Sequence, residues 1–320
     1  MNRPVSRRAA LLSSLALCGT LSLAACGSSG TAGDGAAPAA GGPVTVAGVP
    51  ITRDAALHDA LPDAIKKAGK VRVATDIPYP PFEMYVAEGS KEMTGLDYDL
   101  GQAIGAKLGV VFDFQAQKFD GIVPAVQAGK YDAAMTAITD SKEREQIVDL
   151  VDYSASGTGI MVSKGNPQKI ATLDDLCGHP VAVQSGANQQ KLLEKHQDVC
   201  RTAGKNPVQL LTFPKDSDAQ LALRSGKAVA DVLTKPAAGW TAKNADGGTA
   251  FEVVDDPAAL AGYNASPNGI AISKNLTQLT DAVQKALQQL IDDGTVAKIF
   301  GKYGAESLAV KQATRNGAVD

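Results

Sequence analysis

Two successive runs of alternating strand and helix patterns constrain the fold of this 320-residue chain more than any other feature. Between about residues 54 and 150, short apolar stretches that resemble strands alternate with stretches that have the period of a helix. The same alternation of strand and helix patterns returns between about residues 173 and 233. Parallel strands require a long connection, usually a helix, so this alternation is typical of parallel sheets. The sequence therefore predicts two α/β units, each built on a mostly parallel sheet.

The boundaries of the expected elements follow from apolar periodicity and from glycine and proline signals. In the first unit we expect strands at 70–75, 110–114 and 132–137, and helices at 54–68, 99–108, 121–128 and 141–150. In the second unit we expect a helical turn at 173–176, strands at 181–184, 208–213 and 229–233, and helices at 187–200 and 218–225. An amphipathic helix at 276–293, ended by Gly294, follows near the C-terminus.

Composition is that of an ordinary globular protein, with 44% hydrophobic and 20% charged residues, and the length suffices for two domains. The net charge of -3 gives no indication of nucleic-acid binding. We therefore expect no nucleic-acid partner.

The first 25 residues have the pattern of a signal peptide. Arginines at positions 3, 7 and 8 precede a short apolar stretch at 9–17, which is too short to span a membrane as a mature helix. Leu23-Ala-Ala-Cys26 then resembles a bacterial lipobox, which implies cleavage before Cys26 and lipidation of that cysteine. The alternative is a chance cysteine after a plain signal peptide. Ser6-Arg7-Arg8 is a partial twin-arginine motif, so both export routes stay open.

The segment after Cys26 is rich in Gly, Ala, Ser and Pro as far as Gly48. Such a composition buries too little apolar surface to order itself. We expect residues 26–53 to be the lipidated cysteine and a flexible tether, and residues 311–320 to be a C-terminal tail.

Two cysteines remain after the signal peptide and Cys26 are set aside. Cys177 and Cys200 are an even pair in an oxidising compartment, which favours a disulfide; two reduced buried thiols are the alternative. His58, His179 and His196 are scattered and have no metal-ligand spacing. We predict no metal site and no cofactor.

Polar and aromatic residues follow the predicted strands, where ligands of open α/β sheets bind. In the first unit the candidates are Asp76, Tyr79, Phe119, Ala137, Thr139 and Arg144. In the second unit they are Gln184, Gly186, Asn188, Gln189 and Thr234. The second set leads into a predicted helix whose first N–H groups can hold an anion.

Arg144 is the most informative of these residues, because it stands in the first turn of a predicted helix, where the macrodipole favours acids. Its planar guanidinium matches a carboxylate bidentately. Tyr79 and Phe119 offer aromatic faces to an apolar or cationic group, and Asp76 offers a negative charge. Together these residues suit a small zwitterion or carboxylate.

Five motifs in succession resemble the family 3, amino-acid-type, extracellular solute-binding proteins of ABC importers. They are Val73 to Phe82 (VATDxxYPPF), Gly95 to Ile104 (GLDYDLGQAI), Phe119 to Val126 (FDGIVPAV), Met135 to Arg144 (MTxITDSxER) and Val181 to Gly186 (VAVQSG). The resemblance covers about residues 60–305. Cys177-Gly and Cys200-x-x-Ala-Gly are similar to the disulfide-bearing members from actinobacteria.

The resemblance implies a two-lobe periplasmic-binding-protein-like fold of type II, in which two α/β domains are joined by a two-strand hinge. Lobe 1 is then 54–154 plus 268–310, and lobe 2 is 159–264. The crossovers are expected near 153–159 and 264–269.

Roles at the site also follow from the resemblance. Arg144 is expected to bind the ligand carboxylate, with help from Asn188 and Gln189. The Ala137 carbonyl and the Thr139 hydroxyl are expected to meet the ligand amine, and Tyr79 and Phe119 to stack on its side chain.

One position departs from the family pattern. Where these proteins usually place an Asp for the ligand ammonium, counting from Gly226 gives Thr234 and counting back from Pro236 gives Lys235. A buried ammonium without a counter-charge is costly. Either another acid (Asp76, Asp120 or Asp231) takes this role, or the ligand lacks a primary α-amine.

The sequence thus predicts a monomeric, non-enzymatic lipoprotein on the outer face of the cytoplasmic membrane. It would capture an amino acid or a related small carboxylated zwitterion by lobe closure and deliver it to ABC permease subunits. The alternative is an enzyme of the same fold that resembles cyclohexadienyl dehydratase, which would need a general acid or base poised in the cleft.

Overall fold

The computed structural model describes residues 43–319. The predicted signal peptide at 1–25, Cys26 with its predicted lipid, and the predicted tether as far as residue 42 lie outside the described residues. Within the described range, none of the helices is both long and apolar enough to cross a membrane.

Lobe 1 contains three parallel strands in the order β7-β3-β6. Short connections and αL glycines at the helix ends, such as Gly69 after α2 and Gly109 after α3, let each helix turn back to the next strand. Its elements are α1 (Ala55–Asp59), α2 (Asp63–Ala68), β3 (Lys70–Thr75), α3 (Leu96–Leu108), β6 (Val111–Ala116), η1 (Phe119–Gly121), α4 (Ile122–Gln127), β7 (Ala133–Ala134), α5 (Lys142–Glu145), η5 (Lys274–Leu276), α9 (Thr277–Asp292), α10 (Thr295–Lys302) and η6 (Glu306–Leu308).

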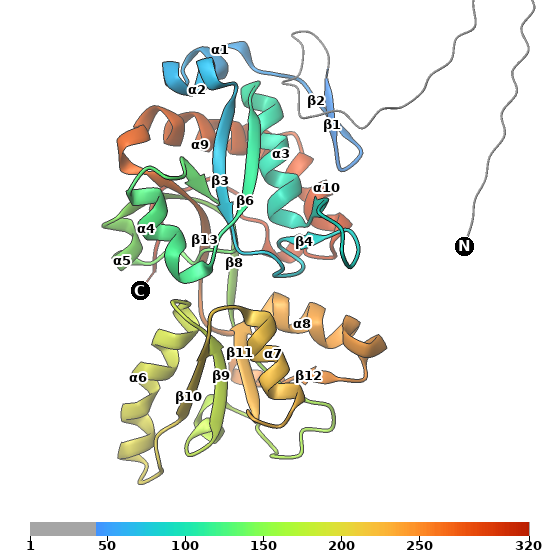
Figure 1. Cartoon of the computed structure of the whole chain (residues 1–320), viewed down its shortest axis with the longest axis vertical. Helices are drawn as coiled ribbons and strands as arrows, with labels where there is room; N and C mark the ends of the chain where they lie inside the picture. The colour runs from blue at the N-terminus through green and yellow to red at the C-terminus, as the bar shows by residue number, and fades with distance from the viewer. Residues whose placement is uncertain (1–42, 320) are drawn as a thin grey trace, which may run out of the picture. The chain divides into compact units, whose positions relative to one another are not determined.

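The main core of lobe 1 forms where α3, α9 and α10 cover the sheet (Figure 1). Fully buried side chains such as Phe82, Leu100, Phe112, Leu287 and Phe300 fill it.

Lobe 2 repeats the arrangement with β10-β9-β11, in which β9 pairs in parallel with both neighbours. Its elements are η2 (Leu173–Leu176), β9 (Pro180–Gln184), α6 (Asn188–Thr202), β10 (Gln209–Phe213), α7 (Asp216–Arg224), β11 (Ala230–Thr234), α8 (Lys235–Asn244), η3 (Ala245–Gly248), β12 (Phe251–Val253) and η4 (Pro257–Ala259). The prediction of two α/β units on mostly parallel strands is therefore confirmed.

Two long antiparallel strands, β8 (Val148–Ser163) and β13 (Tyr263–Ser273), connect the lobes (Figure 1). They lie between β11 and β7, so a single sheet order runs β10-β9-β11-β8-β13-β7-β3-β6. The pairing of β13 with β8 is irregular near Ser266 and again between Asn268 and Gly269. Such irregularities bend strands locally. The lobe boundaries predicted at 154, 159, 264 and 268 fall on these two strands and remain a prediction.

The predicted helix at 141–150 is wrong in its second half. Only Lys142–Glu145 is helical, and the chain enters β8 at Val148. Residues Val148 to Val151 pair with β13 and are all buried, Asp149 included, so burial does not alternate along this run. A buried strand and a buried helix cannot be separated by periodicity when the run is this short.

Several smaller elements also differ from the prediction. The strand expected at 132–137 is reduced to the two residues of β7, and α3 begins at Leu96 rather than at 99. Helix α8 was not predicted, although Pro236 in its first turn is a typical helix-start signal.

The tether prediction differs from the structure over residues 44–51. Here β1 (Val44–Val46) and β2 (Val49–Ile51) form a hairpin whose Val46 and Ile51 are buried in the core of lobe 1. The alternation Val-x-Val and Val-x-Ile is a strand signal that the Gly- and Ala-rich composition before it concealed. A second small hairpin joins β4 (Met84–Tyr85) and β5 (Met93–Thr94).

The C-terminal segment is not a free tail over residues 313–318. Ala313 is buried in lobe 1, and Asn316 exchanges hydrogen bonds with the backbone of Leu150. The backbone N–H of Gly317 donates to Asp140 over 2.8 Å. This segment therefore fastens the chain end to the start of hinge strand β8.

Candidate functional site

A cavity opens where the strand ends of the two lobes face each other. The enclosed volume of this cavity is about 20 Å³. The lining residues are Asp76, Tyr79, Phe119, Thr136, Ala137, Thr139, Gln184, Ala187, Asn188, Gln189 and Thr234. All predicted binding residues except Arg144 and Gly186 are in this set, and Thr136 and Ala187 were not predicted.

Tyr79 forms the wall of the cavity on the side of lobe 1. As predicted, it faces the cavity, whereas Phe82 is fully buried in the core; the two rings stack with centroids 6.0 Å apart. The Tyr79 hydroxyl lies 2.9 Å from the Thr234 hydroxyl and accepts a hydrogen bond from the Thr234 backbone N–H over 3.0 Å. Tyr79 therefore connects the two lobes.

A second bond across the cleft joins Gln184 of lobe 2 to Asp76 of lobe 1, with Nε2 donating to Oδ2 over 2.5 Å. Lys191 of α6 also donates to Glu143 of α5. These contacts describe a closed arrangement of the lobes.

Arg144 lies at the edge of the cavity and is only 7% exposed. Ser141 caps the short helix α5 by accepting from the Arg144 backbone N–H, which directs the side chain toward the cleft. Its Nη1 donates to the Thr139 carbonyl over 2.8 Å, and its Nη2 donates to the Gly186 carbonyl over 3.1 Å. The guanidinium carbon is 5.6 Å from the Phe119 ring centroid. A four-residue helix has little macrodipole, so these contacts, rather than the helix dipole, fix the position of the Arg144 side chain.

Gly186 brings the turn before α6 close to lobe 1. Its φ is +77°, and a Cβ there would lie 3.1 Å from the Cα of Asp120. A side chain at this position would therefore meet both backbone strain and lobe 1. The turn places Asn188 and Gln189, the first residues of α6, in the cavity lining.

Buried carboxyl groups support Ala137 from below. The backbone N–H of Ala137, which has a φ of +47°, donates to Asp97 over 2.8 Å, and the Tyr153 hydroxyl donates to the same oxygen over 2.7 Å. The Thr136 hydroxyl donates to Glu83. Burial raises the pKa of Asp97 to about 6, and burial together with Asp97 raises the pKa of Glu83 well above its usual range. Burial therefore favours the protonated form of this pair, and the network fixes the strained residue at the cavity.

A second group of acids combines Asp76 of lobe 1 with Asp216 and Asp231 of lobe 2. Burial raises the pKa of Asp76 and of Asp216 to about 6, and burial together with Asp216 raises the pKa of Asp231. Both carboxylate oxygens of Asp231 are buried without a hydrogen-bond partner among residues 43–319. Within that range, none of the three acids has a lysine or arginine at ion-pair distance. Burial therefore disfavours the charged form of these acids, and a cation placed nearby would stabilise it.

The position that departs from the family pattern is Thr234. Its side chain lines the cavity, while Lys235 begins α8 and donates to the Ala259 carbonyl over 3.3 Å, away from the cavity lining. Asp231, three residues earlier on β11, is fully buried and is not among the residues that line the cavity.

Sequence reasoning missed Thr136, Ala187, Glu83 and Asp216 at or behind the site. Thr136 and Ala187 adjoin predicted residues, so only their orientation was unknown. Glu83 follows the proline-rich loop and Asp216 begins a helix, and neither position carries a sequence signal that its side chain is buried.

Comparisons with known proteins agree with this geometry. The model of the bacterial extracellular solute-binding proteins, family 3, matches residues 71–306. The arginine-binding protein ArgT of Corynebacterium glutamicum is 30% identical over 257 residues, which are 80% of this chain and 81% of ArgT. The L-cystine-binding protein TcyJ of Escherichia coli is 27% identical over 265 residues, 82% of this chain and 92% of TcyJ.

The fold is also similar to solved structures. The crystal structure of the ancestral amino acid-binding protein AncCDT-1, a precursor of cyclohexadienyl dehydratase, superposes with a TM-score of 0.64 at 33% identity. The match covers 75% of this chain and 98% of that protein.

Proposed function

The chain belongs to the bacterial extracellular solute-binding proteins of family 3, and we propose that it captures an amino acid or a related small carboxylated zwitterion. Its lobes close on this solute and deliver it to the permease of an ABC importer. Lipidation of Cys26 holds the protein, as a monomer, at the outer face of the cytoplasmic membrane.

The observation that carries this proposal is the position of Arg144. Its guanidinium is buried at the cavity and bonded to backbone carbonyls of both lobes, Thr139 in lobe 1 and Gly186 in lobe 2. A carboxylate that approaches this planar cation from the cavity meets matched geometry. It also meets the N-terminal end of α6, which favours an anion in the same place. The predicted binding roles of Asn188, Gln189, Thr139 and Ala137 fit this orientation.

The opposite end of the cavity favours a positive charge on the ligand. Asp76 lines the cavity, and Asp216 and Asp231 lie behind it without basic partners at ion-pair distance among the described residues. A cation that enters between Tyr79 and Phe119 would reduce the electrostatic cost of these carboxylates. We therefore propose a basic amino acid such as arginine. The name of the relative ArgT supports this choice.

Calorimetry of the full chain with arginine and its neutral analogue citrulline tests the proposal. We expect arginine to bind at least tenfold more tightly, because only its side chain compensates the acids. Asp76→Asn should weaken arginine binding and leave citrulline binding unchanged. Equal affinities would overturn the cationic class, while failure to bind any of arginine, lysine, glutamine, cystine, glycine betaine or ectoine would overturn solute capture itself.

The dehydratase alternative is not adopted. The relatives reported above are named for binding, and AncCDT-1 is itself titled an amino acid-binding protein. The acids of raised pKa here are explained by burial beside one another, so they do not by themselves favour a reaction.

A further inference from the structure

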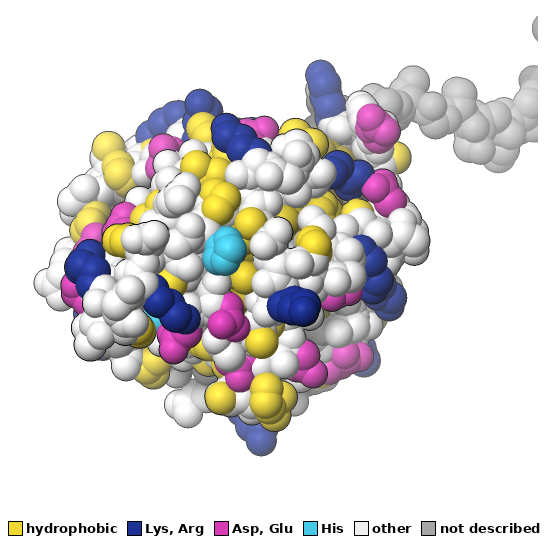
Figure 2. Space-filling view, turned by 90° about the horizontal axis from the view of Figure 1, so that it is seen from below, with side chains coloured by type: hydrophobic (Ala, Val, Ile, Leu, Met, Phe, Trp, Pro, Cys, Tyr) yellow, Lys and Arg dark blue, Asp and Glu magenta, His cyan; other side chains and the backbone are white. Residues whose placement is uncertain are grey.

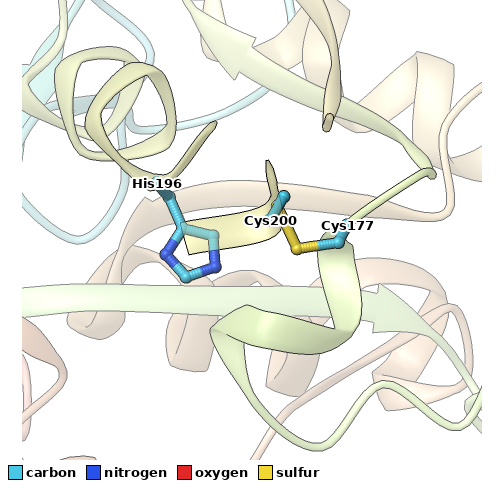
Figure 3. Close-up of side chains that lie close together, drawn as sticks. All are labelled: Cys177, His196 and Cys200. Carbon is cyan, nitrogen blue, oxygen red and sulfur yellow. A yellow bond between two sulfur atoms is a disulfide. The ribbon is translucent and has the colours of Figure 1, made fainter. Parts of the chain in front are cut away.

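We propose that reduction of the Cys177–Cys200 disulfide converts this corner of lobe 2 into a zinc site formed by the two cysteines and His196. The disulfide is present, as predicted, and its Cα atoms are 5.6 Å apart. A ring nitrogen of His196 and both sulfur atoms lie within 4.8 Å of one another (Figure 3). No metal-ligand spacing was predicted for these residues, because both cysteines were assigned to the disulfide.

The positions of the three side chains follow from one helix and one turn. His196 and Cys200 are four residues apart on α6, so they share one face of the helix. Cys177 follows η2 and approaches this face from the side. A tetrahedral zinc ion with thiolate bonds of about 2.3 Å separates its two sulfur ligands by about 3.8 Å. Such a separation is compatible with the present Cα positions, since it requires rotation of the cysteine side chains rather than movement of the backbone.

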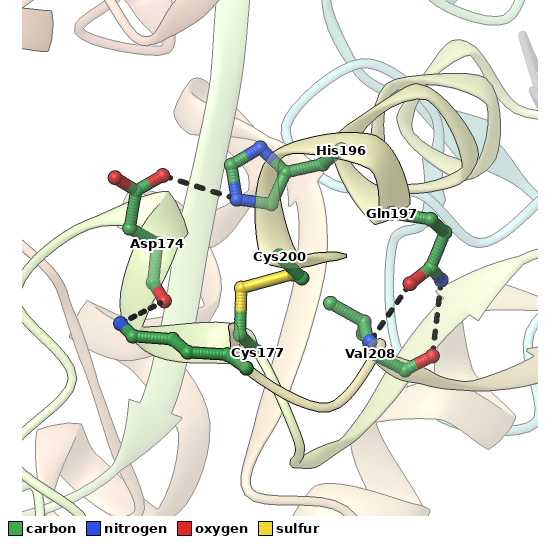
Figure 4. Close-up of a disulfide and its surroundings, with 7 residues drawn as sticks. Asp174, Cys177, His196, Gln197, Cys200 and Val208 are labelled. Carbon is green, nitrogen blue, oxygen red and sulfur yellow. Dashed lines mark hydrogen bonds and ion pairs between the residues drawn. A yellow bond between two sulfur atoms is a disulfide. The ribbon is translucent and has the colours of Figure 1, made fainter. Parts of the chain in front are cut away.

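His196 is a buried histidine with an incomplete set of partners. It is 7% exposed, and its Nε2 lies 3.1 Å from Oδ1 of Asp174 without the alignment of a hydrogen bond. A zinc ion binds only one ring nitrogen of a histidine, so the other nitrogen can stay beside a hydrogen-bond partner. A carboxylate behind a histidine is also the common outer partner of a zinc ligand, because it orients the ring. Asp174 has that position (Figure 4).

The surroundings hold these elements together without the sulfur–sulfur bond. Gln197 of α6 exchanges two hydrogen bonds with the backbone of Val208, over 2.8 and 3.0 Å. Lys205 donates to the carbonyl of Asp174 over 3.1 Å, and a capping box of Thr172 and Asp175 fixes η2. The two thiols are therefore expected to stay close after reduction, which presents them to a metal as a preformed site.

The chemistry balances with a dithiol reductant. The dithiol gives two electrons to the Cys177–Cys200 bond and closes to its own disulfide, which leaves two protein thiols. Binding of Zn²⁺ then releases the two thiol protons to solvent, and the neutral imidazole of His196 supplies the third ligand. Water occupies the fourth position. Soft thiolates with an imidazole favour zinc over magnesium or calcium.

The site has a consequence for the binding cleft, and this part rests on the proposed function. The segment between Cys177 and Cys200 carries every lobe 2 lining residue except Thr234, namely Gln184, Ala187, Asn188 and Gln189. Both the disulfide and the metal close the same loop. Zinc would therefore restore, in the reduced protein, the rigidity of the cleft that the disulfide provides in the oxidised protein.

The test uses the full chain with Cys18→Ser and Cys26→Ser, so that Cys177 and Cys200 are the remaining cysteines. After reduction and removal of the reductant under nitrogen, Co²⁺ and Zn²⁺ are added to the protein. We expect one metal ion per chain, tetrahedral Co²⁺ bands with thiolate charge transfer, and a higher melting temperature with Zn²⁺. The oxidised protein should show none of these changes.

Two variants separate a metal site from a general effect of thiols. His196→Ala should weaken Zn²⁺ binding at least tenfold in competition with a chromophoric chelator, and Asp174→Asn, at an exposed position, should weaken it less. His58→Ala, a histidine of lobe 1, is the matched control and should change nothing. Equal metal binding by the reduced and oxidised proteins, or by reduced His196→Ala and its parent, would overturn the proposal. The metal readouts need no solute, so their failure is distinct from failure of solute capture.

Discussion

The two lobes share the same alternation of strands and helices but are stabilised in different ways. Lobe 1 has a large continuous core, to which the hairpin β1–β2, helices α9 and α10 and the C-terminal segment all contribute. Lobe 2 divides its buried apolar residues among smaller clusters on the two faces of its sheet, and it alone contains a disulfide within the described range. The comparison indicates that a covalent bond in lobe 2 does what additional chain segments do in lobe 1.

The same difference extends to the cleft. Lobe 1 presents Tyr79, Asp76 and Arg144 from segments fixed by the core and by the Glu83–Asp97 network. Lobe 2 presents amide side chains and helix N–H groups from a single segment closed by the disulfide. Substitutions of these lobe 1 residues should therefore change ligand affinity directly. Substitutions of Cys177 and Cys200 should change it by making the lobe 2 segment less rigid.

Arg144→Ala tests the contribution of lobe 1 and should have the largest effect. Loss of a buried charged partner of the ligand carboxylate is expected to cost about 4 kcal/mol of binding free energy, or roughly 1,000-fold in affinity. Calorimetry with arginine measures it. Arg224→Ala, which removes a partly exposed arginine paired with Asp246 in lobe 2, is the matched control and should bind normally. An Arg144→Ala protein with unchanged affinity would show that the carboxylate binds elsewhere.

The double substitution Cys177→Ser and Cys200→Ser tests the disulfide of lobe 2. It should lower the free energy of unfolding by roughly 3 kcal/mol, because the open loop gains entropy in the unfolded chain. Denaturant unfolding with the ligand absent measures this loss. Hydrogen exchange should locate the new openings in α6 and β9 rather than in lobe 1. Uniform loosening of both lobes would contradict the proposed division between core and disulfide.

Asp152→Asn tests the buried acids where lobe 1 meets the hinge. Burial and the neighbouring Asp140 raise the pKa of Asp152 to about 8, far above its ordinary value. The folded protein then holds a proton that the unfolded chain has released, so wild-type stability should fall as pH rises from about 4 to 8, by at most about 1.4 kcal/mol per pH unit. The amide mimics the protonated acid and should flatten this slope.

Asp149→Asn provides a control of opposite sign on the same strand. Hydrogen bonds and charges from Arg315 and Lys274 outweigh burial and lower the pKa of Asp149, so its contribution is present above the ordinary acid range and is lost at low pH. The variant should be less stable than wild type from pH 5 to 8 without a change in slope. Thermal melts across this pH range measure the stability of both variants. Parallel pH profiles for wild type and Asp152→Asn would refute the prediction that Asp152 holds a proton in the folded protein.

Tyr79→Phe tests the contact between the lobes and should have the smallest effect. Removal of the hydroxyl breaks its bonds to Thr234 but leaves the ring and its stacking on Phe82 in place. We expect a loss of about 1 kcal/mol in ligand affinity, because closure is weakened while the aromatic wall remains. Calorimetry with arginine again measures it. A loss as large as that of Arg144→Ala would mean that the hydroxyl contacts the ligand itself.

Much of the architecture could be predicted because strands and helices here carry clear local signals. The αL glycines Gly69, Gly109 and Gly294 mark helix boundaries correctly. The predictions that were wrong concern residues whose secondary structure depends on tertiary pairing. Residues 148–150 are compatible with a helix by pattern, yet they become strand because β13 supplies a pairing partner from more than a hundred residues away.

The candidate site shows the same limit. Residues that follow strands, such as Asp76, Tyr79 and Gln184, could be expected at one edge because topology brings strand ends together. The acids behind them could not, since Asp216 and Asp231 become buried only when lobe 2 packs around them. The proximity of His196 to both cysteines was likewise hidden, because Cys177 reaches α6 only through the fold.

The order of strands has a consequence for how the protein is made. β13 lies between β8 and β7, and α9 covers the core of lobe 1, yet both come near the end of the chain. Lobe 2, by contrast, is one uninterrupted insertion. As the polypeptide is delivered from its N-terminus, the sheet of lobe 1 lacks a central strand until residue 273 has arrived, whereas lobe 2 already has all of β9, β10 and β11. The half that depends on a covalent bond is therefore the half that is complete first.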